Sequence, residues 1–541
     1  MIKLPEALVA RLRKQLGPAG YEAYAACLRE EPRAGLRFNM GKGSDAELRK
    51  LLPFELKPVP WAPSGYEYPR DARPAKSPYY YAGLYYLQEP SAMVPAAALG
   101  VAPGDRALDL CAAPGGKATQ LADALGGTGV LVANDSNAKR VKSLIWNLEH
   151  WGATRYVALN ETPRELASSF SGYFDKVLVD APCSGEGMFR RDPGASRSWR
   201  VYSGDQCRRA QDEILDHAVK MLAPGGRLMY STCTFNPQEN EDAVAALLQR
   251  HRELGMEPLP MYEGWQSGVA LAECRLLWPH LTRGEGQFMA LISKPGPDGK
   301  RVTERGKKSA ETRSFADTHE PTPESEPNRA RSAEPNPESG SERAKANETI
   351  HAQTSASAHS QAAQPTPAIA SARSRVAEPT PANAYTPANA STRSRSAEST
   401  QTDSRRAPPA ALERFMEDNL NYPIDGPFAV YQGHVYQIAY NLPDLAGLKV
   451  SRHGWYLGKI TNERFTPSQP MAIGLKTGQF KKCLDLDPNG SDVQRYIRSE
   501  TLMTQGERGL TLVTLAGFPL GFGKQEDGFF KNMYSSGWRL T

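Results

Sequence analysis

The chain contains 541 residues and 7 cysteines, with 65 lysines and arginines against 60 aspartates and glutamates and a formal net charge of +5. This length exceeds one hydrophobic core and predicts roughly two to four domains. The mild positive charge is not that of a protein coated by nucleic acid, and irregularly spaced cysteines favour a reducing compartment over a disulfide framework. Because no run approaches the roughly 18 apolar residues of a membrane helix, we expect a cytoplasmic protein without a membrane partner.

Residues 1–75 are predicted to form a small, mostly helical module. Leu8, Val9, Leu12 and Leu16 recur at helical spacing. Basic residues outnumber acidic ones over this stretch, and a series of prolines from position 58 to position 69 then interrupts regular structure. We therefore expect the module to end near residue 75.

Residues 76–295 alternate between apolar strand-like segments and helical segments. The predicted strands are Arg106–Leu110, Val130–Asn134, Tyr156–Leu159, Lys176–Val179, Gly226–Tyr230 and Gln287–Ile292. The predicted helices are Lys117–Leu125, Ala138–His150, Asp205–Leu222 and Pro237–Arg250. Such alternation predicts an α/β domain with a parallel sheet and helices on both faces.

Residues 296–408 change abruptly to serine, threonine, proline, alanine, glutamate and arginine, with imperfect repeats. Apolar residues are too sparse here to offset the entropy of ordering, so we predict a disordered linker. A small repeat domain is the alternative interpretation. Residues 409–541 regain aromatic and β-branched residues in short alternating segments, which predicts a compact α+β domain that folds on its own.

A loop rich in small residues follows the first predicted strand and leads into a helix. It consists of Cys111, Ala112, Ala113, Pro114, Gly115, Gly116 and Lys117. Glycines at a strand–helix junction let the backbone approach a nucleotide-like ligand. The chain has no G-x-G-x-x-G motif, and Lys117 is followed by alanine where a P-loop requires serine or threonine. Neither a dinucleotide nor a nucleoside triphosphate is therefore favoured.

Asp135 follows the second predicted strand. An acidic residue in this position accepts hydrogen bonds from ribose hydroxyls, which suits S-adenosyl-L-methionine, and we expect that cofactor. The alternative is that Asp135 caps the helix that begins near Asn137.

Two cysteines follow neighbouring strands: Cys183 lies in Asp-Ala-Pro-Cys-Ser-Gly, and Cys233 lies in Ser-Thr-Cys-Thr-Phe-Asn. Since strand ends share one edge of an α/β sheet, both thiols are expected to point into one site. A buried cysteine is commonly only a small apolar residue, but polar, proline-containing loops favour chemistry.

A thiolate that adds to carbon-6 of a pyrimidine makes carbon-5 nucleophilic, so that carbon-5 can take a methyl group. The cysteines therefore predict covalent methyl transfer to a pyrimidine. Asp180 is placed to serve ring nitrogen-3 and the exocyclic amine if its carboxyl holds or shares a proton. From the chemistry alone, either Cys183 or Cys233 can be the nucleophile.

The chain resembles the NOL1/NOP2/Sun family of RNA cytosine carbon-5 methyltransferases, and within it the bacterial RsmF type. The segments that carry the resemblance are 35–39, 86–91, 108–117, 179–187, 230–236 and 278–286. The resemblance covers roughly residues 1–295 and 410–541. It implies a Rossmann-like methyltransferase domain over residues 76–295, a small N-terminal α/β RNA-binding module over residues 1–75 and a C-terminal PUA-like RNA-binding domain over residues 409–541.

The resemblance also implies roles for single residues. Cys233 corresponds to the nucleophile, and Cys183 to the second cysteine, which helps to release the product. The loop 111–117, Asp135 and Asp180 correspond to cofactor positions. The family commonly has a third acidic cofactor contact after the third strand, where this chain has Asn160.

The resemblance implies RNA of the small ribosomal subunit, free or assembled, as the substrate. Single-stranded or splayed bases are the accessible targets, because chemistry on a base requires it out of the stack. We expect a monomer without a metal. Trp455, Tyr456, Lys459, Lys531 and Arg539 are candidates for RNA contacts in the C-terminal domain. The alternatives are a tRNA methyltransferase, a non-catalytic ribosome-assembly factor, an amino-group methyltransferase and a DNA methyltransferase.

Overall fold

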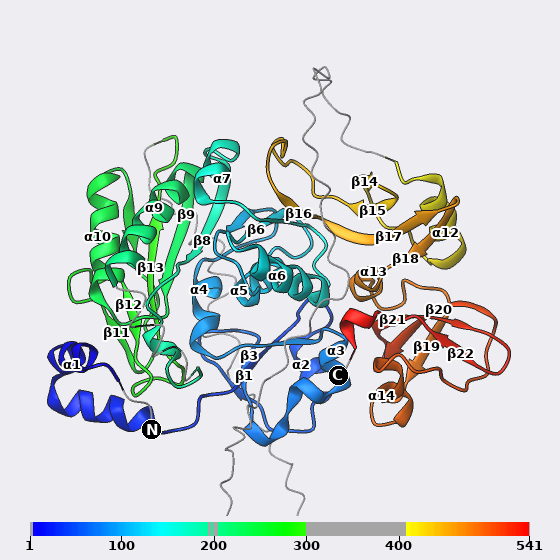
Figure 1. Cartoon of the computed structure of the whole chain (residues 1–541), viewed down its shortest axis with the longest axis horizontal. Coiled ribbons are helices and arrows are strands. Elements are labelled where there is room, and N and C mark those ends of the chain that lie inside the picture. Colours follow the sequence, from blue (N-terminus) through cyan, green and yellow to red (C-terminus); the bar gives the residue numbers. More distant parts are fainter. Residues whose placement is uncertain (1–3, 193–194, 196–198, 200–203, 299–406, 540–541) are drawn as a thin grey trace, which may run out of the picture. The chain divides into compact units, whose positions relative to one another are not determined.

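The computed structural model describes residues 4–192, 195, 199, 204–298 and 407–539 (Figure 1). Almost all of the expected linker, residues 299–406, lies outside the described residues. Among the residues that the structure describes, no helix combines the length and the apolar character that crossing a membrane requires.

One ten-stranded sheet organises the region of alternating strands and helices, in the order β11-β12-β13-β9-β8-β5-β6-β7-β16, with β10 paired to β13. Its strands are β5 (Arg106–Asp109), β6 (Val130–Asn134), β7 (Tyr156–Leu159), β8 (Phe174–Asp180), β9 (Leu222–Thr232), β10 (Gly255–Glu257), β11 (Trp265–Ser267), β12 (Arg275–Leu277), β13 (Gln287–Ser293) and β16 (Val450–His453). Strands β5 to β9 are parallel. The order reverses between β5 and β8, which is where open α/β sheets bind ligands.

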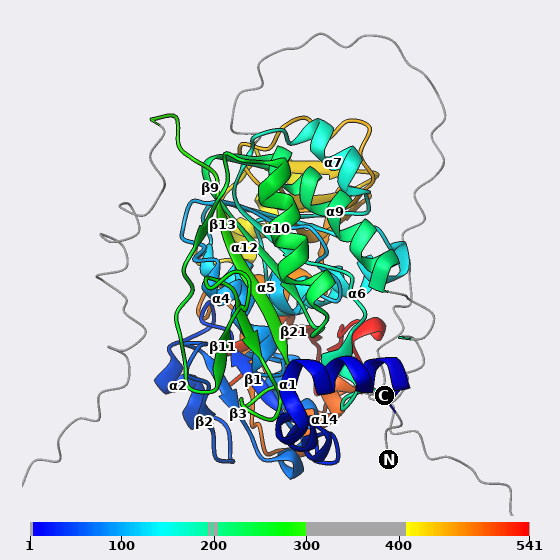
Figure 2. The same ribbon diagram turned by 90° about the vertical axis from the view of Figure 1, so that its left-hand side faces the viewer.

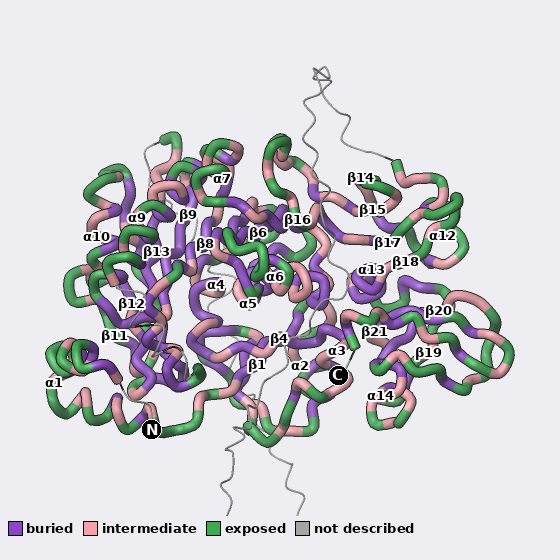
Figure 3. Tube along the Cα trace, in the orientation of Figure 1, coloured by how far each residue is buried: buried purple, intermediate pink, exposed green. Residues whose placement is uncertain are grey.

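Helices cover both faces of this sheet, as predicted. They are α4 (Val94–Ala98), α5 (Gly116–Ala124), α6 (Ala138–Trp151), α7 (Pro163–Ser169), α9 (Gly204–Met221) and α10 (Glu241–Arg250), the last preceded by the 3₁₀ turn η5 (Pro237–Glu239). Apolar residues of α4, α5 and α6 share one buried cluster, and those of α7, α9 and α10 share another. Figure 2 shows α9 and α10 along one face of β9 and β13. Burial on both faces leaves β6, β7 and β13 wholly buried (Figure 3).

The expectation of a wholly parallel sheet is wrong at both edges. β13 pairs antiparallel with β9 and with β12, and β16 pairs antiparallel with β7. Parallel neighbours require a crossover connection, usually a helix, whereas a loop without a helix joins β12 to β13. The other edge strand, β16, comes from the C-terminal part of the chain, beyond the region in which the sheet was expected.

The N-terminal region is not mostly helical, because it contains a four-stranded sheet in the order β2-β3-β1-β4. Its elements are α1 (Glu6–Cys27), β1 (Gly35–Phe38), α2 (Asp45–Lys50), β2 (Lys57–Pro58), β3 (Gly65–Glu67), α3 (Pro78–Tyr81) and β4 (Tyr85–Leu87). Strands of two to four residues are too short to show alternation in the sequence. The helix predicted from Leu8 to Leu16 is the first half of α1, which kinks at Gly17. An N-terminal α/β module is what the family resemblance implied.

The C-terminal region has the predicted α+β character. The helix α12 (Ala410–Asn419) precedes a sheet of β14 (Phe428–Tyr431), β15 (His434–Gln437), β17 (Trp455–Thr461) and β18 (Arg464–Pro467). After α13 (Gln469–Gly474), a second sheet contains β19 (Cys483–Leu486), β20 (Gly509–Leu515), β21 (Phe518–Gln525) and β22 (Phe530–Asn532), with α14 (Ser491–Ile497) between its first two strands.

Candidate active site

The residues predicted for the site lie at the carboxyl ends of the parallel strands. In chain order they are the loop 111–117 after β5, Asp135 after β6, Asn160 after β7, Asp180 at the end of β8, and Cys183 and Cys233 in the loops after β8 and β9. The sheet topology therefore gathers at one edge residues that are as far as 122 positions apart in the sequence (111 to 233).

The two cysteines are in direct contact. Their Sγ atoms are 3.4 Å apart, and both thiols are reduced. The hydrogen bond to Cys233, reinforced by burial, raises the pKa of Cys183 well above its usual range. Cys183 is therefore held as a thiol, in direct contact with the sulfur of Cys233.

Asp180 is held by three donors. Lys117 Nζ donates to Oδ2 at 2.8 Å, while Ser231 Oγ and Gln287 Nε2 approach Oδ1 at 2.7 and 3.3 Å. These three contacts fix the orientation of the Asp180 carboxyl group. The proton-sharing form considered from the sequence stays a prediction.

Lys117 is not a surface lysine, since only 13% of its side chain is exposed. Burial lowers its pKa, but the negative charge and hydrogen bond of Asp180 outweigh burial, and the pKa of Lys117 is raised overall. Lys117 therefore remains charged. Cys233 also contributes to this shift, so the Lys117 ammonium lies within electrostatic range of the Cys233 sulfur.

Asp135 supports the cofactor loop directly. Its carboxylate accepts hydrogen bonds from the backbone of Ala113 at 3.3 Å and Asn137 at 2.9 Å, and it forms an ion pair with Arg140 at 3.0 Å. The helix cap considered as an alternative is supplied by Asn137, which accepts from the backbone N–H groups of Lys139 and Arg140. Asp135 is thus not needed as the cap of α6.

The loop 111–117 is built for a close approach of backbone to ligand. Gly115 has φ +123°, a backbone conformation that residues other than glycine rarely adopt. A Cβ at Gly116 would lie 3.2 Å from the Tyr86 ring. Helix α5 starts at Gly116 without a side-chain cap, so its first N–H groups remain available to a polar ligand.

Asn160 donates from Nδ2 to the backbone oxygen of Asp135 at 2.8 Å. The neighbouring acid, Glu161, is buried and turned toward the C-terminal region, where it accepts from the Lys449 backbone N–H at 2.6 Å. The structure therefore leaves Asn160, rather than Glu161, beside Asp135. Its role as the third cofactor contact stays a prediction.

Sequence reasoning missed Asp109, the last residue of β5. It is 1% exposed, and neither carboxylate oxygen has a hydrogen-bond partner. Burial, followed by the charge of Asp180, raises the pKa of Asp109 to about 8. The sequence feature that could have identified Asp109 is a carboxylate at the end of an apolar strand, directly before the loop 111–117. Asp109, Asp135 and Asp180 together fit a cofactor with cationic groups and a ribose, such as S-adenosylmethionine.

Two buried glutamates that sequence reasoning also missed tie the cysteine loops together. Glu239 accepts from the backbone N–H and the hydroxyl of Ser184 at 2.9 and 2.6 Å, and Ser184 Oγ lies 2.8 Å from Thr234 Oγ1. Glu186 accepts from the backbone N–H of Phe235 at 3.1 Å. Ser184 and Thr234 each directly follow one of the two cysteines, so these contacts fix the loops against each other.

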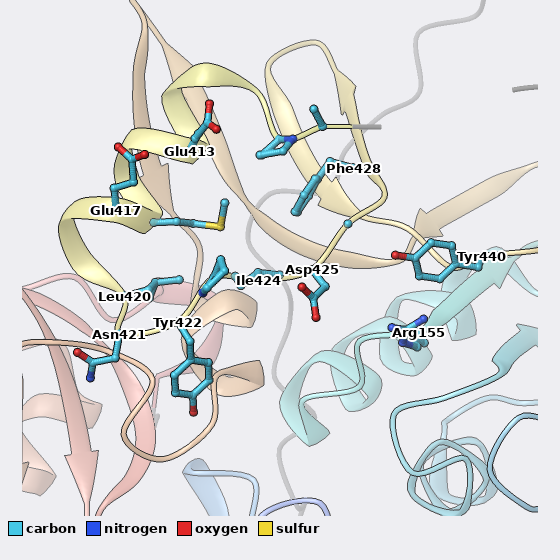
Figure 4. Close-up of a pocket in the computed structure, with 15 residues that line it drawn as sticks. Arg155, Glu413, Glu417, Leu420, Asn421, Tyr422, Ile424, Asp425, Phe428 and Tyr440 are labelled. Carbon is cyan, nitrogen blue, oxygen red and sulfur yellow. The ribbon is translucent and has the colours of Figure 1, made fainter. Parts of the chain in front are cut away.

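A separate hollow of about 800 Å³ lies between α12, the segment 420–428, Arg155 and Tyr440 (Figure 4). None of its lining residues belongs to the predicted site. The described residues contain no group of three or more histidine, cysteine, aspartate or glutamate side chains that could hold a metal ion.

Four family models match successive parts of the chain. They are described as 16S rRNA methyltransferase RsmB/F (residues 96–293), N-terminal domain of 16S rRNA methyltransferase RsmF (4–90), RsmF rRNA methyltransferase first C-terminal domain (414–475) and Methyltransferase RsmF PUA domain (483–540). Together they leave out the segment 294–413, which contains the expected linker.

Similar relatives are the ribosomal RNA small subunit methyltransferase F proteins of Cronobacter sakazakii, 37% identical over 308 residues, and of Escherichia coli O127:H6, 34% identical over 307 residues. These alignments cover 54% of this chain and 63% and 64% of the two relatives. The crystal structure of PH0851 is 28% identical, with a TM-score of 0.50 over 54% of this chain and 66% of that chain.

These matches confirm the predicted Rossmann-like methyltransferase fold with an N-terminal RsmF domain and a C-terminal PUA domain. They also confirm S-adenosylmethionine as the cofactor, which the carboxylates and the loop 111–117 fit. The four matches together confirm the resemblance to the RsmF type, because the RsmF N-terminal, RsmB/F methyltransferase, RsmF first C-terminal and RsmF PUA models follow one another along the chain.

Proposed function

We propose that the chain transfers a methyl group to carbon-5 of a cytosine in small-subunit ribosomal RNA. The observation that carries this proposal is the contact of two thiols at 3.4 Å, one of which, Cys183, has its pKa raised by this contact and by burial. A reaction that adds a nucleophile to a pyrimidine ring and later eliminates it has two separate tasks for two such thiols.

Cys233 is the nucleophile in this proposal. Its thiolate forms a bond from Sγ to carbon-6, which breaks the 5,6 double bond and leaves carbon-5 electron-rich. The Cys183 sulfur at 3.4 Å and the Lys117 ammonium lie beside the Cys233 sulfur in this reaction. S-adenosylmethionine, when bound, supplies the methyl group. A base then takes the carbon-5 proton, the electrons of that C–H bond reform the 5,6 double bond, and the bond from carbon-6 to Sγ breaks with its electrons returning to sulfur; Cys183 assists this release.

In this proposal the remaining predicted residues bind the cofactor and orient the cytosine base. The loop 111–117, Asp135 and Asn160 hold the cofactor, with the ribose assigned to Asp135. Asp180 lies 2.8 Å from the Lys117 ammonium and can accept a hydrogen bond from the exocyclic amine of cytosine. Uracil has a carbonyl oxygen at that position, which a carboxylate cannot bind, so Asp180 favours cytosine over uracil.

Ribosomal RNA is proposed as the substrate because the relatives are named as methyltransferases of small-subunit ribosomal RNA. The match to a PUA domain over residues 483–540 supports RNA as the partner. In that domain Lys531 lies on β22 and is exposed, whereas Trp455, another predicted RNA contact, is buried and donates to the Pro470 backbone oxygen. Trp455 is therefore a core residue and not an RNA contact.

Bisulfite sequencing of ribosomal RNA from cells with and without the gene tests the proposal. We expect a protected cytosine in small-subunit RNA that is lost without the gene and is restored by the wild-type chain but not by Cys233→Ala. Restoration by Cys233→Ala would overturn the covalent route. A lost mark in transfer RNA, with ribosomal RNA unchanged, would overturn the substrate.

A further inference from the structure

Helix α1 of the N-terminal region contacts the loop that carries Cys233. Gln15 of α1 donates from Nε2 to the Phe235 backbone oxygen at 3.0 Å. Tyr24 of the same helix packs edge-on against the Phe235 ring, with centroids 5.9 Å apart. Phe235 follows Cys233 by two positions, so α1 holds the backbone next to the nucleophile of the proposed function.

Glu186 connects the same loop to α1 through charge. Its Oε2 accepts from the Phe235 backbone N–H at 3.1 Å, and its Oε1 forms an ion pair with Arg11 of α1 and accepts from Trp199 Nε1 at 2.9 Å. Glu186 lies in the turn η4 (Glu186–Met188), three residues after Cys183. One carboxylate therefore joins the Cys183 loop, the Cys233 loop and the N-terminal helix.

This carboxylate is fully buried, whereas 24% of the Arg11 side chain is exposed. A buried carboxylate is stable only when it is paired and hydrogen-bonded. Without Arg11, Glu186 must take up a proton or move toward solvent, and either change weakens its bond to the Phe235 backbone. The next residue, Gly187, is itself tied to the Cys233 loop, because its backbone N–H donates to the Cys233 backbone oxygen at 2.8 Å.

We propose that Arg11 and Glu186 are positioning residues that fix the Cys233 sulfur against Cys183, so that the N-terminal helix completes the active site. This inference rests on the proposed function in taking Cys233 as the nucleophile. Neither residue touches the substrate or the cofactor in this proposal, because both act through the backbone of Phe235. Glu239 fixes the other side of the same loops through Ser184.

The test compares full-length Arg11→Gln, Arg11→Lys and Glu186→Gln with Arg13→Gln. Arg13 lies on the same helix but faces solvent, with 60% of its side chain exposed; it contacts Glu22 at 3.8 Å and lies over the Tyr21 ring at 4.8 Å. The first readout is the rate at which iodoacetamide alkylates Cys233 in the free enzyme, measured by peptide mass spectrometry. Cys483, which is exposed and lies in β19, serves as the internal reference.

Arg11→Gln and Glu186→Gln are expected to slow alkylation of Cys233 and to lower kcat by about tenfold, since small misplacements of reacting groups cost this much or more. The KM for RNA, the calorimetric affinity for S-adenosylmethionine and the alkylation of Cys483 are expected to stay within about twofold of wild type. Arg11→Lys should recover part of kcat, and Arg13→Gln should match wild type. Each single variant already removes the ion pair between Arg11 and Glu186. The kcat of the double variant Arg11→Gln/Glu186→Gln should therefore be no lower than that of the poorer single variant.

Unchanged kcat and unchanged Cys233 alkylation in a folded Arg11→Gln protein would overturn the proposal. An increase confined to the KM for RNA would also overturn it, since α1 would then be a substrate contact. If Arg11→Gln or Glu186→Gln does not fold, Gln15→Ala gives the milder test through the Phe235 oxygen, with the same readouts. Alkylation is measured without turnover, so its result is separate from failure of the proposed function, which a fully active Cys233→Ala would reveal.

Discussion

At the scale of single residues, the contact between Cys183 and Cys233 gives the two thiols unequal roles. Cys183 keeps its proton because the hydrogen bond to Cys233 and burial raise its pKa. Cys233 lies 3.4 Å from Cys183 and within electrostatic range of the charged Lys117. The sequence placed both cysteines at strand ends but left the nucleophile open on chemical grounds, and this asymmetry supports Cys233.

The two cysteines should therefore fail differently when they are replaced. Cys233→Ala should abolish methylation and any covalent protein–RNA species. Cys183→Ala should allow addition but slow release, so that a ribonuclease-sensitive adduct accumulates as a slow band on a denaturing gel. Reversed phenotypes, with an adduct in Cys233→Ala, would assign the nucleophile to Cys183 and contradict the proposed roles.

Asp109 predicts a pH dependence of stability. Burial first, and then the charge of Asp180, raises its pKa from 3.8 to about 8 in the folded chain. Between these values the folded chain holds a proton that the unfolded chain has released, so stability falls as pH rises, by at most about 1.4 kcal/mol per pH unit. The contribution is fully present below about pH 4 and is lost as pH passes the folded pKa near 8.

Replacing Asp109 by asparagine removes this titration at nearly constant shape. Urea unfolding of the cofactor-free protein at several values between pH 5 and pH 9 is the measurement. We expect the stability of Asp109→Asn, relative to wild type, to increase with pH and to level off above about pH 8. A stability difference that does not change with pH would show that Asp109 does not carry the proton.

At the scale of elements, the long amphipathic helices and apolar strands of the methyltransferase region could be predicted from the sequence, because their periodicity spans enough residues. Strand β6 has the predicted limits, and α6 ends one residue beyond them. The short strands of the N-terminal sheet and the strand β16 could not be predicted, because they carry no period and because β1 and β16 lack the continuous apolar run of the equally short β7. Lys449, Arg11 and Glu186 could not be predicted from the sequence either, because only tertiary contacts bring them to the site.

A further prediction concerns Lys449, the residue that precedes strand β16. The Lys449 N–H donates to buried Glu161 at 2.6 Å, whereas the Lys449 ammonium is 73% exposed and 3.4 Å from the same carboxylate. Lys449→Pro should cost about 1–3 kcal/mol of unfolding free energy, because a buried carboxylate loses its donor. Lys449→Ala keeps the N–H and should cost less than about 1 kcal/mol. Equal losses in thermal or urea unfolding would show that Glu161 does not depend on the backbone donor.

At the scale of the whole molecule, the C-terminal region is joined to the methyltransferase sheet by more than the covalent chain. β16 extends that sheet beside β7. Arg452 of β16 forms an ion pair with Glu149 of α6 at 2.9 Å, and both side chains are largely buried. Trp538, close to the C-terminus, packs against Trp146 with centroids 5.7 Å apart. The linker is therefore not required to keep the two regions together.

This predicts that a chain cut at a protease site introduced within residues 299–406 stays associated. After cleavage, the fragments ending before and beginning after the cut should coelute in size-exclusion chromatography and keep methyltransferase activity on RNA. Arg452→Ala leaves Glu149 buried without its cation, which should weaken the association by about 2–5 kcal/mol. Arg464→Ala, on an exposed position of β18, is the matched control and should leave the fragments together. Separation of the wild-type fragments would mean that the edge strand β16 does not hold the C-terminal region, and that the linker does.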